Sequence, residues 1–502
     1  MAKKTARDHI LTEKTVKKGK AKVQSDSRFK SLKSFSILSV IIFAAICIVF
    51  NILFDKLFDK TLTFDASSVQ INTVGSFTRS YLKSLDKKVE IIGLFDKNDT
   101  SKEWYDYFIP IIDDYEAKAD GKITVSYIDP SVNPFIMTEL DPNNMFGIKA
   151  DTYVIRSGDR LISIDPYQCF QYDQDILNTY GLRMLTANDV ELNITGSIMY
   201  VVSENPLHAY YLTGHNENTS HSNLDNILLS LSMVSQDLNL TDGTTTIPSD
   251  CDIIMILQPM HDISTHERDL LRYYLDEGGV VLIVNDFSNN KTVDYTNLNE
   301  VTRYRGISME TGLLHENDTR YLLHSDDPYS SLGISDPEST TFKNGSYNTS
   351  YNRYMSLYQE AASDIVAGAL LTTSDMASVD YLNMTVNNDL SVGTYPIVLK
   401  GVKSEVEGAL LVFATADFTS DNYFSVKTLN DSNAEFIYNC IGSSCTTNIS
   451  VPYIPEKTIP NYNLTQPLSS NAATLWSVVV MTLIPIGGLI CGIAIYKRRR
   501  HL

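Results

Sequence analysis

Residues 249–287 read SDCDIIMILQPMHDISTHERDLLRYYLDEGGVVLIVNDF, and this stretch decides the fold. It begins with a short, almost entirely apolar run from Asp252 to Leu257, which is followed by Pro259. A second apolar run extends from Val280 to Val284. Continuous apolar runs of this length are typical of strands buried on both faces of a parallel sheet. We therefore predict two buried parallel strands here.

A helix is predicted between these strands. Ser264 and Glu267 form a capping-box pattern, in which the hydroxyl and the carboxylate each accept a backbone amide hydrogen. Gly278 and Gly279 provide the left-handed end of the helix. The apolar residues between them share one helical face: Leu270, Leu271, Tyr274 and Leu275. The stretch thus predicts a right-handed βαβ crossover, and it carries no catalytic signature of its own.

The flanking sequence extends this pattern. A strand is predicted from His208 to Leu212, a helix over 224–231, and a last buried strand from Ala409 to Ala414. Alternation of buried strands and amphipathic helices predicts a doubly wound α/β domain. The polar region 289–398 is predicted to be a long insertion with hairpins and loops, and Asn430 to Ile441 a closing helix.

A second, smaller unit is predicted before this domain. Strands are expected over 88–95 and 122–129, and a hairpin around Ser157-Gly158-Asp159. The helix between the strands has one apolar face: Trp104, Phe108, Ile111, Ile112 and Tyr115. This βαβ unit has thioredoxin-like proportions. No CxxC motif lies near it, so thiol redox chemistry is excluded.

Two apolar segments predict membrane anchors. Residues 35–54 and 475–496 are each about long enough to span a bilayer as a helix. The basic tails 1–33 and 497–502 flank them on the terminal sides, which places both termini in the cytoplasm and residues 55–474 outside. The net charge is −19 although both tails are basic, so the chain between them is strongly acidic. An acidic ectodomain argues against nucleic-acid binding, whereas the basic tails suit anionic membrane lipids.

Four cysteines lie outside the anchors: Cys169, Cys251, Cys440 and Cys445. Cys440 and Cys445 could close a small disulfide loop in an oxidising compartment, or could be buried thiols. No zinc-ligand spacing is present, and we expect no metal or cofactor.

Several motifs occur in an order that is typical of one family. They are SYIDP at 126–130, YYLTGHNE at 210–217, IPSDCDIIMILQP at 247–259, the helix and strand that follow, and LLVFATADFTSDNYF at 410–424. This order resembles the gliding-motility-associated auxiliary proteins of ABC transporters, the GldG-like family, over roughly 80–290 and 405–445. The resemblance implies an ectodomain related in fold to class I glutamine amidotransferases, on a bacterial cell membrane. It also implies an accessory or substrate-capturing role beside an ABC permease and its ATPase.

One position departs from the family pattern, which usually has a TGHGE-like segment. Asn216 stands at the second glycine, and asparagine is the residue that best replaces glycine at positive φ. Thr213, Gly214, His215, Asn216 and Glu217 follow a predicted parallel strand, where such folds bind ligands, and Asp417 follows another. We take these six residues as the candidate ligand-binding site. The alternative is that Gly214 and Asn216 shape the turn while His215 and Glu217 cap the next helix.

The predicted organisation has seven parts. They are the tail 1–33, the anchor 35–54, a thioredoxin-like domain 59–165, an amidotransferase-like domain 166–445, a Pro-rich stalk 446–470, the anchor 475–496 and the tail 497–502. No GxxxxGK[ST] motif, GxSxG elbow or suitably placed nucleophilic cysteine is present, so we expect a non-enzymatic transporter subunit. The alternatives are an ectodomain hydrolase acting on envelope polymer or peptide and a structural envelope protein. A homo-oligomer is compatible with each, and the 29 tyrosines suggest a carbohydrate- or peptide-binding surface.

Overall fold

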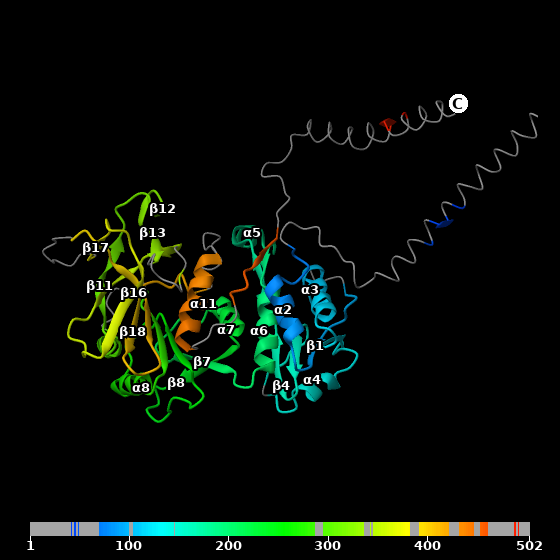
Figure 1. Ribbon diagram of the computed structural model, residues 1–502, viewed down its shortest axis with the longest axis horizontal. Coiled ribbons are helices and arrows are strands. Elements are labelled where there is room, and N and C mark those ends of the chain that lie inside the picture. Colours follow the sequence, from blue (N-terminus) through cyan, green and yellow to red (C-terminus); the bar gives the residue numbers. More distant parts are fainter. Residues whose placement is uncertain are drawn as a thin grey trace, which may run out of the picture.

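The computed structural model describes two α/β units that lie side by side (Figure 1). Described residues are 70–99, 104–144, 146–286, 295–335, 342, 345–381, 391–420, 431–445 and 452–459, with single positions at 42, 45, 46, 49, 486, 487 and 490. No helix among them is long and apolar enough to cross a bilayer. Nearly all of both predicted anchors, and both basic tails, lie outside the described residues.

The N-terminal unit contains the predicted βαβ arrangement and hairpin. Its four-stranded sheet has the order β2-β1-β3-β4, in which only β1 and β2 are parallel. A smaller sheet has the order β20-β6-β5. The elements are α2 Ser76–Ser84, β1 Val89–Gly93, α3 Tyr105–Lys118, β2 Ile123–Tyr127, α4 Phe135–Leu140, β3 Tyr153–Ser157, β4 Arg160–Ile164, η1 Pro166–Cys169, β5 Phe170–Tyr172, α5 Gln174–Tyr180, β6 Leu185–Asn188, α6 Val190–Val202 and β20 Lys457–Thr458.

The core of this unit extends further along the chain than the boundary at 165/166 predicts. All five residues of the predicted α3 face are fully buried. The same hydrophobic cluster includes Cys169 and Phe170 and four residues of α6: Val190, Ile194, Ile198 and Val201. The predicted boundary therefore divides this core, because α6 packs against β1, β3 and β4 of the four-stranded sheet as well as leading into the second unit.

The second unit is built on a ten-stranded sheet. Its order is β12-β13-β16-β18-β19-β10-β9-β7-β8, with β14 beside β13. The elements are β7 Leu207–Thr213, α7 Ser222–Ser230, β8 Met233–Asn239, β9 Ile253–Leu257, α8 Thr265–Asp276, β10 Val280–Val284, α9 Thr296–Arg303, β11 Ile307–His315, β12 Leu322–His324, β13 Asp327–Ser335, β14 Ser346–Ser350, β15 Arg353–Leu357, β16 Ile365–Thr372, β17 Ser378–Asp380, β18 Pro396–Lys403, β19 Leu410–Phe413 and α11 Asp431–Cys445.

The parallel half of the sheet confirms the predicted α/β class. β8, β7, β9, β10 and β19 are parallel neighbours, and every residue of β9 and β10 is buried. The capping box of Ser264 and Glu267 is present, and Gly278 has φ 93° at the end of α8. The chain winds from β7 to β8 in one direction and from β9 to β10 in the other. The reversal between β7 and β9 makes this a doubly wound sheet.

The polar region 289–398 was predicted to be an insertion with hairpins and loops, but much of its described part belongs to the main sheet. Its described residues form strands that continue the main sheet: β18 pairs antiparallel with β19, β16 with β18, and β13 with β16. A separate three-stranded sheet has the order β15-β11-β17. These antiparallel strands bury polar side chains such as Ser330, Ser331 and Thr349. β13 and β14 lack a continuous apolar run, which is why the sequence did not show these two strands.

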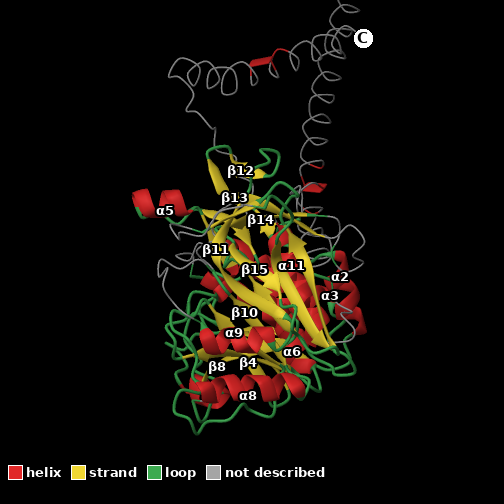
Figure 2. Ribbon diagram, turned by 90° about the vertical axis from the view of Figure 1, so that its left-hand side faces the viewer, coloured by secondary structure: helices red, strands yellow, loops and turns green. Residues whose placement is uncertain are grey.

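Helices cover both faces of the main sheet. α7 packs against both α6 and α11, so these helices lie between the two units (Figure 1). α8 packs against α9 at the end of the unit far from β12 and β13 (Figure 2).

Candidate functional site

The predicted loop follows β7 at the point where the winding of the sheet reverses. Gly214 has φ 119°, and a Cβ there would lie 2.5 Å from Thr241 Cγ2. Asn216 has φ 58°, the left-handed conformation that we expected for this position. The amide of Asn218 donates to the carbonyl of Leu257, which fixes the loop beside the end of β9. The loop is therefore a defined turn at the carboxyl edge of the sheet.

His215 lies at the centre of this turn, with only 5% of its surface exposed. Its Nδ1 is 2.7 Å from Glu217 Oε1, and its Nε2 is 3.2 Å from Glu267 Oε2. Burial alone would lower the pKa of His215, but the hydrogen bonds to the two carboxylates outweigh it and raise the pKa to about 9. His215 is therefore an imidazolium at neutral pH, with both N–H groups donating to carboxylates.

Glu267 joins this turn to α8. Its Oε2 accepts from the backbone amide of Ser264 at 2.8 Å as well as from His215. Burial would raise the pKa of Glu267, but the bonds from His215 and Ser264 outweigh it and lower the pKa. The turn is thus tied to the first turn of α8. The side chains of His215 and Glu217 do not cap α7, which was the alternative for these two residues. A ligand at His215 would have to displace one of the two carboxylates.

Asp417 belongs to a different cluster from His215. It follows β19, which is separated from β7 by β9 and β10, a distance of about 14 Å at ordinary strand spacing. Ser350 Oγ donates to both carboxylate oxygens, at 3.0 and 2.9 Å. Burial and the nearby charge of Asp286 raise the pKa of Asp417 from 3.8 to about 7, against the hydrogen bonds that lower it. The six predicted residues therefore form two separate groups.

A chain of hydrogen bonds spans the edge between these groups. Asn218 Nδ2 donates to Gln258 Oε1 at 2.7 Å and to Ser420 Oγ at 3.0 Å, and Gln258 Nε2 donates to Asp286. Sequence reasoning missed these residues. Gln258 and Asp286 lie within two residues of the ends of β9 and β10, which is a signal that could have identified them. Ser350, by contrast, comes from a strand that the sequence did not predict.

Replacement of Asp417 by asparagine is expected to stabilise the protein increasingly as pH rises above about 4. The raised pKa means that ionisation of Asp417 opposes folding, so the wild type loses this stability as pH rises from about 4 through 7. We expect Asp417→Asn to match the wild type at pH 4 and to exceed it by about 2–4 kcal/mol at pH 8. Urea unfolding at both pH values measures this difference. The exposed Asp113→Asn is the control, and equal effects of the two variants would contradict the prediction.

The predicted disulfide is not formed. Cys440 and Cys445 are free thiols within α11, and burial raises the pKa of each. Five residues along an α-helix correspond to a rotation of about 140° between the two side chains, so their sulfur atoms point in different directions. No group of three or more histidine, cysteine, aspartate or glutamate side chains suited to a metal ion occurs among the described residues.

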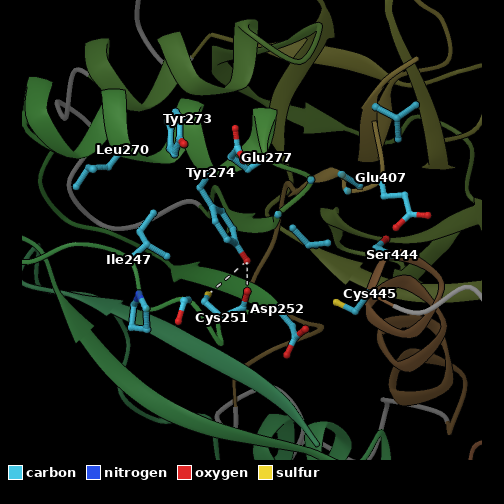
Figure 3. A pocket seen from close by; sticks show the side chains of 18 of the residues that line it. Ile247, Cys251, Asp252, Leu270, Tyr273, Tyr274, Glu277, Glu407, Ser444 and Cys445 are labelled. Atoms are coloured by element: carbon cyan, nitrogen blue, oxygen red, sulfur yellow. Dashed lines mark hydrogen bonds between the residues drawn. The ribbon is translucent and has the colours of Figure 1, made fainter. Parts of the chain in front are cut away.

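A cavity of about 860 Å³ lies at the opposite edge of the sheet, around the amino ends of β9, β10 and β19 (Figure 3). No sequence pattern indicates this cavity, because its walls come from separate segments. They are the loop before β9, the C-terminal half of α8, β18, the turn before β19 and the end of α11; the residues that bear on its chemistry are Cys251, Tyr274, Glu277, Lys400, Glu407, Ser444 and Cys445.

Comparison with known proteins gives similarity of fold only. No family model and no curated protein matches the chain. Solved structures with some similarity include the mmIFT52 N-terminal domain, with 17% identity and TM-score 0.35 over 47% of this chain and 97% of that one. A putative thua-like protein from Parabacteroides merdae has 12% identity and TM-score 0.30, over 49% and 93%. A glutamine amidotransferase from Thermotoga maritima has 9% identity and TM-score 0.25, over 41% and 74%. No function is transferred at these values.

Proposed function

We propose that this chain is a non-enzymatic, membrane-anchored accessory subunit of an ABC-type transporter, with an amidotransferase-like ectodomain outside a bacterial membrane. The two anchors at 35–54 and 475–496 hold it in the membrane, with both termini in the cytoplasm. Two helices are too few for a transport pathway, and the chain has no phosphate-binding GxxxxGK[ST] motif. The permease and the ATPase are therefore partners.

One observation carries the proposal: the two ends of the ectodomain are fastened to each other. Lys457 Nζ lies 2.7 Å from Glu191 Oε2 and donates to the carbonyl of Thr73. Glu191 Oε1 accepts from the amide of Gly75 at 2.6 Å and from Thr78 Oγ1 at 2.5 Å. We call this group the terminal clamp.

The clamp supports a chain that leaves a membrane and returns to it at one place. β20 pairs with β6, and the segment 452–459 runs along the N-terminal unit (Figure 1). This segment belongs to the predicted stalk 446–470, which therefore packs against the domain in its described part. Residues 73–75 lie beside residue 457. The chain that leads to the first predicted anchor and the chain that leads to the second therefore leave the N-terminal unit at neighbouring points. This arrangement suits paired anchors beside a permease.

Affinity purification tests the proposal. The full-length chain is isolated from its native membrane in mild detergent, and co-purifying proteins are identified by mass spectrometry, with an untagged chain as the control. An ATPase and a multi-helix permease at near-equal amounts are the expected result. Clean recovery of the chain without either protein refutes the transporter role.

One observation favours the second candidate, an ectodomain hydrolase. Asp417, with a pKa of about 7, is protonated in part at neutral pH and could serve as a general acid beside Asp286. Turnover of envelope polymer or peptide by the wild type, with loss in Asp417→Asn, would support this candidate. Absence of turnover across such substrates would count against the hydrolase and favour the accessory role.

A further inference from the structure

Lys400 is the side chain that gives the 860 Å³ cavity its chemistry. It lies on β18, and its Nζ donates to Ser444 Oγ at 3.0 Å. Ser444 Oγ in turn donates to the carbonyl of Cys440 at 2.8 Å. An ammonium group carries three donors, so this single bond leaves two of them for another partner.

No carboxylate within the described part of the chain forms an ion pair with Lys400. Lys403, on the same strand, has Asp276 at 3.1 Å. Burial lowers the pKa of Lys400, as expected for a cation without a counter-charge. The cavity thus holds a positive charge that a bound anion would neutralise.

The remaining walls restrict which anion fits. Tyr274 points from α8 toward Cys251, whose thiol and carbonyl both bond its hydroxyl, and Ser444 and Cys445 lie across the cavity (Figure 3). Glu277 and Glu407 are exposed at the rim. These carboxylates disfavour a phosphate dianion, which also usually requires several donors or an arginine. Burial raises the pKa of Cys251 to about 12, so its thiol is not a nucleophile at neutral pH.

We propose that this cavity binds an amino acid or short peptide, with the ligand carboxylate on Lys400 and Ser444 and its ammonium group near Glu277 and Glu407. The volume lies within the usual range for small-ligand sites. Tyr273, Tyr274 and Leu270 provide apolar surface for ligand side chains. The site is distinct from the carboxyl-edge clusters of His215 and Asp417, and it requires no transporter partner to bind.

Binding of a tripeptide pool tests the proposal. Full-length protein in detergent is dialysed against pooled tripeptides with free carboxyl groups, and retained peptides are measured by mass spectrometry. The same pool with amidated carboxyl groups is measured in parallel, and so is an N-acetylated pool. We expect retention of the free acids, at least tenfold weaker binding of the amides, and weaker binding of the acetylated peptides.

Two variants complete the test. Lys400→Met is expected to reduce retention at least tenfold, whereas Lys403→Met, on the same strand but paired with Asp276, leaves it unchanged. Circular dichroism shows whether each variant is folded. If Lys400→Met does not fold, the test rests on the wild-type protein alone, through its binding of free-acid peptides compared with amidated peptides. No retention from the pool, equal retention of acids and amides, or undiminished binding by a folded Lys400→Met variant overturns the proposal.

Discussion

Replacing Glu191 by alanine is expected to lower the free energy of unfolding of the N-terminal unit by about 3–5 kcal/mol, because the change leaves Lys457 buried without its partner. The side chains of Glu191 and Lys457 are only 5% and 12% exposed. The carboxylate also accepts from Gly75 and Thr78, so two further donors lose their acceptor.

Urea unfolding monitored by tryptophan fluorescence measures this loss. The chain has two tryptophans, and Trp104 is fully buried in the core of the N-terminal unit, so its emission reports that unit. Glu90→Ala is the matched control. It removes a carboxylate that lies 2.7 Å from Arg156, but both side chains are more than one third exposed, so less than about 1 kcal/mol should be lost. Similar losses in the two variants would show that the terminal clamp does not stabilise the fold.

The stability of the second unit is expected to fall by about 3 kcal/mol between pH 6.5 and pH 10. The pKa of His215 is raised in the folded state from 6.5 to about 9 by its bonds to Glu217 and Glu267, despite its burial. A group with a raised folded pKa contributes its full stability below the unfolded pKa and loses it as pH rises through the folded pKa. The loss should therefore centre between pH 6.5 and 9.

A substitution of His215 isolates this effect from other titrating groups. His215→Gln cannot carry the charge, so the variant should be less stable than the wild type at pH 6.5 and should lack the decline above it. Exposed His261→Gln serves as the control and should retain the wild-type pH dependence. The measurement is the urea midpoint by circular dichroism at pH 6.5, 8 and 10. An unchanged decline in His215→Gln would exclude the imidazolium bridge as its cause.

Local sequence patterns were sufficient where an element is apolar or capped. The strands β9 and β10 were predicted because both faces are buried, and α8 because Ser264 and Glu267 carry the capping-box pattern. Asn216 at positive φ also followed from the residue type. In each case the physical cause lies within a few residues, so the sequence alone displays it.

The rest depends on contacts between distant residues. β8, with the sequence MVSQDLN, is an edge strand with an irregular burial pattern, and it was not predicted. His215 meets Glu267 because α8 begins at the carboxyl edge of the sheet, 52 residues along the chain, and Asp417 meets Ser350 through a strand of the polar region. Lys400 and Ser444 come from a strand and a helix that no pattern brings together. The predicted site residues lie at the carboxyl ends of the parallel strands, whereas the cavity lies at the amino ends of the same sheet.

The terminal clamp also determines when the N-terminal unit can finish folding during translation. Thr73 precedes Lys457 by 384 residues, so the N-terminal unit is made long before the residue that closes it. At about 5–20 residues per second, roughly 20–80 s of translation separate the two. Glu191 precedes Lys457 by 266 residues, so for roughly 13–53 s of translation Glu191 lacks this cation and β6 lacks its neighbour β20. The first unit to emerge from the ribosome is consequently among the last to be completed, and its folding finishes only after the whole second unit has been synthesised.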